Sequence, residues 1–215
     1  SLNDLAATFL EFAEEEIPEI MTSKSLKNVL LTEKEGRVDS ERSQVFIARE
    51  RHAMARKGGF GYPGRAIRTD DFLYIHNYEP DRWPAGDPPL FGDIDGHMLQ
   101  YFSPAKEFMM ENKNDPKVKI LYEQAFMKRP KEELFDLKND PFQMNNVAYS
   151  DEYQNIKKQL AAQLKEYLVS TEDPRETGGE IIWDTSTYFN EADWIGTPRK
   201  EAREKFMLNA EYSYK

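Results

Sequence analysis

Apolar residues recur at helical spacing near the start of the chain. Leu5, Phe9 and Phe12 lie three or four residues apart, so a helix would carry them on one face. Asn3 stands where a helix N-cap is expected, and Pro18 follows at a position that favours termination. The pattern predicts a helix over residues 2–13.

Short segments with the apolar patterns typical of strands follow. Residues 44–50 (QVFIARE) form one run, and residues 132–137 (EELFDL) form another. Between them, residues 65–69 and 71–78 predict a hairpin that turns at Asp70 and Asp71. We interpret Arg65 as a surface charge of that hairpin.

Three further segments predict helices. Residues 103–112 and 115–126 have mixed apolar and polar patterns, and residues 150–170 give the clearest helical pattern in the chain. Ser150 is placed to cap this last helix. Its apolar stripe consists of Tyr153, Ile156, Leu160, Leu164, Tyr167 and Leu168. Residues 171–215 are polar and broken, with one more short helix predicted at residues 198–206.

Strands joined by short turns, with helices grouped before and after them, favour the α+β class. We expect a small antiparallel β-sheet of about four strands packed with the long helix near the C-terminus. The order of the elements contains no strand–helix–strand series that would support a doubly wound parallel sheet.

Composition narrows the classes of function. The chain has 215 residues, a hydrophobic content of 39% and a formal net charge of −10, which allows one core and disfavours nucleic acid or an anionic membrane as partner. There is no Cys, so disulfides, thiolate metal sites and thiol nucleophiles are excluded within this sequence. No apolar run approaches the roughly 18 residues of a membrane span.

Common catalytic motifs are missing from the sequence. The glycine-rich stretch at residues 57–64 (KGGFGYPG) lacks the spacing of a phosphate-binding loop, and there is no G-x-S-x-G nucleophile elbow. His52, His76 and His97 are too widely spaced to form a helical metal-ligand pair. The stretch D-I-D-G at residues 93–96 lacks the further ligands of a calcium loop.

Four ionisable residues, Arg49, Glu50, Arg51 and His52, end the first predicted strand. Strand alternation places Glu50 and His52 on one side and Arg49 and Arg51 on the other, where either pair could bind a sugar hydroxyl or an anionic group. The alternative is a solvated strand end followed by an ordinary glycine-rich turn. Charge and spacing alone favour that alternative.

Three stretches of the chain resemble the C-terminal part of sulfatases, and the heparan N-sulfatase (sulfamidase) branch most closely. They are DLAATFLEF at residues 4–12, the run from RERHAMARKGGFGYPGRAIRT through DRWPAGDPP at residues 49–89, and ELFDLKNDPFQMNNVA at residues 133–148. The resemblance covers roughly residues 1–170, in the same order as in the family.

The resemblance implies a domain organisation. Residues 1–170 would form the C-terminal subdomain of an alkaline phosphatase-like sulfatase, with residues 1–40 as the connecting helix and loop from the catalytic domain. Residues 171–215 would be an extension that packs on this subdomain. The expected partners are the N-terminal catalytic domain and a sulfated sugar of the glycosaminoglycan type, with no nucleic acid and no membrane.

The resemblance also implies where catalysis occurs. Sulfatases use a formylglycine made from Cys or Ser in C/S-x-P-x-R, together with calcium, and both belong to the part upstream of the region that resembles this chain. No S-x-P-x-R occurs here. We therefore expect this chain alone to be inactive and to bind neither cofactor, with a location in the periplasm, outside the cell or in a lysosome-like compartment.

By the same resemblance, Glu50 and His52 would recognise the sugar, and Arg49 or Arg51 would hold a carboxylate or sulfate. A second hypothesis is a non-catalytic carbohydrate-binding or interaction module, and a weaker third is a phosphodiesterase relative. Exposed apolar surface separates the first two: the helix at 2–13 and the stripe at 150–170 need a large partner surface unless the tail covers both.

Overall fold

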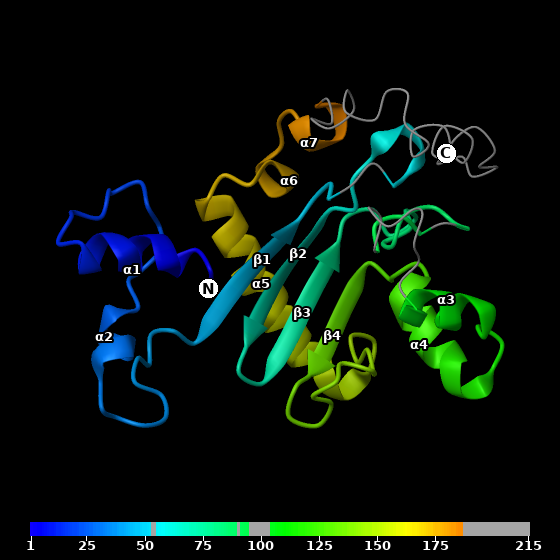
Figure 1. Cartoon of the computed structure of the whole chain (residues 1–215), viewed down its shortest axis with the longest axis horizontal. Helices are drawn as coiled ribbons and strands as arrows, with labels where there is room; N and C mark the ends of the chain where they lie inside the picture. Colours follow the sequence, from blue (N-terminus) through cyan, green and yellow to red (C-terminus); the bar gives the residue numbers. More distant parts are fainter. Residues whose placement is uncertain (53–54, 90, 95–103, 187–215) are drawn as a thin grey trace. The chain divides into compact units, whose positions relative to one another are not determined.

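The computed structural model describes residues 1–52, 55–89, 91–94 and 104–186 (Figure 1). The chain divides into two compact units, Ser1–Val45 and Phe46–Lys215. The boundary falls inside the first strand, so most of the sheet and all residues of the candidate site belong to the second unit.

The first unit contains helices α1 (Asp4–Phe12) and α2 (Lys27–Leu31). The carboxylate of Asp4 accepts hydrogen bonds from the Arg42 guanidinium at 2.8 Å and from the Lys24 amide at 3.2 Å. The polar face of α1 is therefore the buried one. The large apolar residues Leu5, Phe9 and Phe12 are exposed, by 66% for Phe9.

The helix at the start of the chain is confirmed, but its predicted cap is wrong. Asn3 is the residue before α1, and its side chain makes no capping hydrogen bond within the described part of the chain. The start of the helix is held by Asp4 instead, whose carboxylate also accepts from the amino group of Ser1 at 3.0 Å.

Four strands form one sheet, as predicted, and their order is β1-β2-β3-β4. They are β1 (Gln44–Arg49), β2 (Gly64–Thr69), β3 (Phe72–Asn77) and β4 (Glu132–Asp136). The register pairs Ile67 with Tyr74 and Tyr74 with Leu134, both antiparallel. Neighbouring strands run in opposite directions across the sheet, so the antiparallel α+β prediction is confirmed (Figure 1).

The long helix α5 (Gln154–Ser170) covers one face of the sheet (Figure 1). Its residues Leu160, Leu164 and Leu168 are at most 5% exposed and pack with Ile67, Tyr74 and Leu134 from the strands. The rings of Phe46 and Tyr167 stack at 3.7 Å between centroids. The strands, together with Val147 and Ala148 after β4, thus bury the leucines of the predicted stripe, whereas its Tyr153, Ile156 and Tyr167 are half-buried.

The start of α5 differs from the prediction. A short 3₁₀ turn (Asp151–Tyr153) precedes the helix, and the Ser150 side chain makes no capping hydrogen bond to the described residues. The Gln154 amide group instead donates to the carbonyl groups of Ala148 and Ser150, at 3.1 and 2.9 Å.

The second face of the sheet carries a smaller cluster of Ala66, Leu73 and Phe135. Helices α3 (Pro104–Glu111) and α4 (Pro116–Phe126) belong to a separate cluster centred on Ala85, Phe91 and Phe126, which includes the proline-rich loop after β3. Both helices were predicted.

After α5 the chain forms two short helices, α6 (Pro174–Thr177) and α7 (Ile182–Thr185). The carboxylate of Asp173 caps α6 by accepting from the Arg175 amide at 2.9 Å. The predicted helix at residues 198–206 lies outside the described residues. Within the described part of the chain, no helix combines the length and the apolar character needed to cross a membrane.

Candidate functional site

The four charged residues at the end of β1 take part in different clusters. Because β1 ends at Arg49, strand alternation does not continue through residues 50–52. Arg49 and His52 both contact Asp93, whereas Glu50 contacts Arg65 and Arg175. The predicted grouping of Glu50 with His52, and of Arg49 with Arg51, is therefore wrong.

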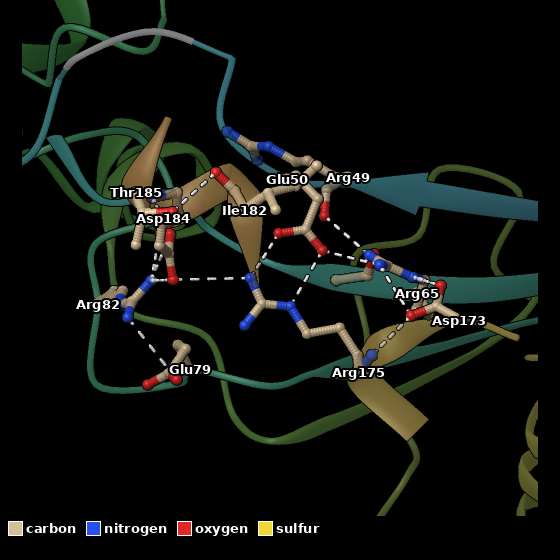
Figure 2. Close-up of polar contacts among 12 residues, drawn as sticks. Arg49, Glu50, Arg65, Glu79, Arg82, Asp173, Arg175, Ile182, Asp184 and Thr185 are labelled. Atoms are coloured by element: carbon tan, nitrogen blue, oxygen red, sulfur yellow. Dashed lines mark hydrogen bonds and ion pairs between the residues drawn. The ribbon is translucent and has the colours of Figure 1, made fainter. Parts of the chain in front are cut away.

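Glu50 is the centre of a closed ionic cluster (Figure 2). One carboxylate oxygen lies 2.7 Å from Arg65 Nη2, and the other accepts from Arg175 Nη2 at 2.6 Å. Arg65 also donates to Asp173, through Nε at 2.7 Å. Both carboxylate oxygens of Glu50 are thus engaged by guanidinium groups, and its side chain is 11% exposed.

The cluster continues to α7 through Asp184 (Figure 2). The Asp184 carboxylate accepts from the Gly61 amide at 3.0 Å and lies 3.3 Å from Arg82 Nη1 and 3.6 Å from Arg175 Nη2. Residues 173–186 are therefore attached to the loop after β1 by polar contacts at several points.

Burial and ionic contacts shift the pKa values of Asp173 and Asp184 in opposite directions. Burial of Asp173 favours its neutral form, but hydrogen bonds from Arg65 and the Arg175 amide outweigh burial and lower its pKa. The pKa of Asp184 is also lowered, because the Gly61 amide and Arg82 outweigh burial. At neutral pH both carboxylates are ionised and able to pair with the buried guanidinium groups.

Arg65 corrects a prediction, since its side chain is 2% exposed and is not a surface charge. Burial disfavours its charged form, yet the hydrogen bonds to Asp173 and Glu50 raise its pKa. Arg51 also has a structural role, because its Nη2 donates to the Ser186 hydroxyl at 3.0 Å.

Asp93 is the centre of the second cluster, which is open to solvent on one side. Its Oδ2 accepts from Arg49 Nη2 at 2.7 Å and from Arg56 Nη2 at 2.6 Å, and its Oδ1 lies 3.0 Å from His52 Nδ1. The side chains of Asp93 and Arg56 are 0% exposed, but those of Arg49 and His52 are 44% and 69% exposed.

The Asp93 cluster has more positive than negative charge. Two guanidinium groups contact one carboxylate, and within the described residues the buried Nη1 of Arg56 has no hydrogen-bond partner. The Tyr62 ring packs against both guanidinium groups. Its centroid is 5.6 Å from Arg49 Cζ and 5.7 Å from Arg56 Cζ. An exposed arginine and an exposed histidine held beside such a surplus are suited to bind an anion.

Sequence reasoning identified Arg49 and His52 but missed the residues that orient them. Asp93 lies 44 positions after Arg49 and 37 positions after Arg56, the two arginines that it contacts. No local sequence pattern connects residues so far apart. The one sequence feature that included a member of this cluster was the D-I-D-G stretch with Asp93, which was interpreted only with respect to calcium binding.

The metal implied by the family resemblance finds no ligand set in this part of the chain. In the described residues, no group of three or more His, Cys, Asp or Glu side chains is arranged to hold a metal ion. The carboxylates of Asp173 and Asp184 are each paired with arginine. These residues do not fit calcium.

Comparison with known proteins identifies sulfatases as sequence relatives. No family model matches the chain. Two proteins of Formosa agariphila, each named an ulvan-active sulfatase, are similar to it: one is 33% identical over 110 residues and the other 25% identical over 174 residues. These matches cover 51% and 79% of this chain, but only 17% and 29% of the relatives.

Solved structures give similar coverage. A structure in complex with D-glucosamine-2-N,6-O-disulfate aligns with a TM-score of 0.48 and 26% identity, over 80% of this chain and 25% of its own. A 2-O glycosaminoglycan sulfatase aligns with a TM-score of 0.44 and 18% identity, over 80% and 25%. The two curated relatives are sulfatases, and this chain is similar in sequence to a part of them.

Proposed function

We propose that this chain is the C-terminal, substrate-recognising part of a sulfatase that acts on sulfated sugars. The observation that carries the proposal is the Asp93 cluster, where Arg49 and His52 are held at the surface beside an excess of positive charge. A sulfate or sulfamate group needs several oriented donors, and these two side chains provide them.

Within this proposal the four predicted residues have two roles. Arg49 and His52 contact the anionic group of the sugar because their side chains are exposed. Glu50 and Arg51 position the loop, because Glu50 is engaged by two guanidinium groups and Arg51 donates to Ser186.

The rest of the proposed enzyme would be supplied by an N-terminal catalytic domain. Formylglycine and calcium would belong to that domain, and this chain alone would release no sulfate. The exposed apolar face of α1, with Leu5, Phe9 and Phe12, supports a partner surface of this kind. We further propose an exported location, and a sulfate ester or a sulfamate of a glycosaminoglycan-type sugar as the substrate group, as the resemblance to sulfatases implies.

A non-catalytic carbohydrate-binding module is the second candidate, and it would use the same cationic surface. The two candidates differ in what precedes Ser1 in the coding DNA. An in-frame Cys or Ser followed by x-P-x-R supports the sulfatase, and sulfate release from N-sulfoglucosamine by the longer protein is then expected. A stop codon and a start site there would overturn the sulfatase proposal.

The recognition part is tested on the 215-residue chain itself. We expect N-sulfoglucosamine to shift the NMR signals of the His52 ring and of the Arg49 Nε–H group in a saturable way. Glucosamine, which has the same ring without the sulfate, is the matched control and should cause no such shifts. Equal shifts with both sugars would contradict recognition of the anionic group.

A further inference from the structure

The second face of the sheet, on the side opposite to α5, lines a half-open cavity of about 370 Å³. Its floor includes Ala66, Leu73 and Ile75 from the strands, and its roof includes Ala85 and Ala125. The cavity thus lies between two hydrophobic clusters, one on the sheet and one under the loop after β3. Atoms that line such a space lack part of the dispersion contacts that close packing provides.

Tyr62 lines this cavity and has an unsatisfied hydroxyl group. The residue is 3% exposed, and in the described part of the chain its hydroxyl has no hydrogen-bond partner. Buried tyrosine hydroxyls are normally hydrogen-bonded, so an unpaired one beside a cavity indicates that an acceptor is missing.

The charges around the Tyr62 hydroxyl also line the cavity. Burial and the Glu133 carboxylate raise the pKa of Tyr62, and Arg129 and Arg49 act in the opposite direction but more weakly. The hydroxyl is therefore a neutral hydrogen-bond donor at neutral pH.

The balance of these charges favours an anion. Glu133 accepts from Arg129 and, at 2.9 Å, from the Asn77 side chain, so it is already neutralised. Arg49 and Arg65 are the other lining cations, and their carboxylate partners Asp93, Glu50 and Asp173 are outside the lining. A bound cation would find no unengaged lining carboxylate within the described residues, whereas an anion would find the unpaired Tyr62 hydroxyl in a lining that has three arginines for one carboxylate.

We propose that this cavity binds a small amphiphilic anion, with an apolar body against Ala66, Leu73 and Ala125 and a carboxylate that accepts from the Tyr62 hydroxyl. The volume is at the lower end of that of ligand pockets, which suits a body of roughly ten heavy atoms. His52 is not among the lining residues, whereas Arg49 lines the cavity and also contacts Asp93, so the cavity adjoins the proposed sugar site and goes beyond its function.

Benzoate is a suitable probe, and benzamide is its neutral control of the same shape. In an NMR titration we expect benzoate to shift the methyl signals of Ala66, Leu73 and Ala85 with saturation in the millimolar range, as a ligand of nine heavy atoms allows. Benzamide should bind about tenfold more weakly, because it lacks the charge.

Two variants locate the binding. Tyr62→Phe removes the donor and should weaken benzoate about tenfold, while the unfolding midpoint stays the same or rises because an unsatisfied polar group is lost. Ala125→Leu fills the cavity and should abolish benzoate binding. Lys138→Ala, at an exposed residue outside the cavity, is the control and should leave benzoate affinity unchanged.

Two results would overturn the proposal: absence of saturable benzoate binding to the wild-type chain, or equal affinity in the wild-type and Ala125→Leu chains. Neither result bears on N-sulfoglucosamine binding read from the His52 ring, because His52 does not line the cavity. The failure of one proposal is therefore distinguishable from the failure of the other.

Discussion

Glu50 and Asp93 are the carboxylates at the centres of two ionic clusters, and residues 49–52 contribute to both clusters in different ways. Glu50 contacts two arginines whose side chains are 2% and 8% exposed, and its cluster is closed. Asp93 contacts one arginine that is fully buried and one that is 44% exposed, together with His52. Adjacent residues at the end of β1 thus contribute to a structural cluster and to an open one.

The difference shows how a chain can expose positive charge at a fixed position. In the Asp93 cluster, the buried carboxylate and the Pro84 carbonyl accept from Arg49 Nη2, and the buried Arg56 fixes that carboxylate, so the exposed Arg49 side chain loses little freedom when it binds a ligand. In the Glu50 cluster every guanidinium has a carboxylate partner, so the contacts stabilise the fold and leave little charge for a ligand.

The largest expected effect is on the closed cluster. Glu50→Ala leaves Arg65 and Arg175 without their shared carboxylate, and breaking a buried ion pair in this way costs about 3–5 kcal/mol of the free energy of unfolding. Urea unfolding measures this loss in the free energy of unfolding. His52→Ala is the matched control from the same loop and should change the free energy of unfolding by no more than about 0.5 kcal/mol. Equal losses in the two variants would contradict the assignment of Glu50 to structure.

Asp93→Asn should have a smaller effect on stability. The asparagine keeps one oxygen for the buried Arg56 but removes the negative charge, so the loss is about 2 kcal/mol, the range of a hydrogen bond to a charged group. The exposed Arg49 should become more mobile. Faster exchange of the Arg49 Nε–H signal in NMR checks this, and an unchanged signal would mean that Asp93 does not fix Arg49.

Acid should release residues 173–186 before the sheet unfolds. The pKa values of Asp173 and Asp184 are lower in the folded chain than their ordinary value of 3.8, so their contribution to stability is complete above pH 3.8. It is lost as the pH falls through the folded values. NMR signals of Arg175 should therefore change at a higher pH than those of the sheet core. Simultaneous change would show that the segment is not held by these carboxylates.

The fold could be predicted because its signals are local. The hairpin of β2 and β3 follows from two apolar runs around Asp70 and Asp71, and α5 follows from a stripe at helical spacing. Capping was less predictable, because Asn3 and Ser150 are good capping residues whose positions were right but whose side chains do not cap. The backbone at these sites is satisfied by other groups.

The candidate site could be predicted only in part, because its contacts are distant in sequence. Glu50 and Arg175 are 125 positions apart, and Arg49 and Asp93 are 44 positions apart. The sequence shows four charged residues in a row, but it does not show which distant charged residues would pair with them. The cavity had no sequence signal at all, since Tyr62, Ala66 and Ala125 meet only when the sheet, a loop and a helix are assembled.

The central claim is that Arg49 and His52 form the ligand-binding part of this loop, and the affinity of their variants for N-sulfoglucosamine tests it most directly. We expect Arg49→Gln and His52→Ala each to weaken binding about tenfold, the value of one hydrogen bond to a charged group, with the unfolding midpoint of His52→Ala unchanged. The structural variant Arg51→Gln should bind like the wild-type chain. Wild-type affinity in both Arg49→Gln and His52→Ala would contradict the account.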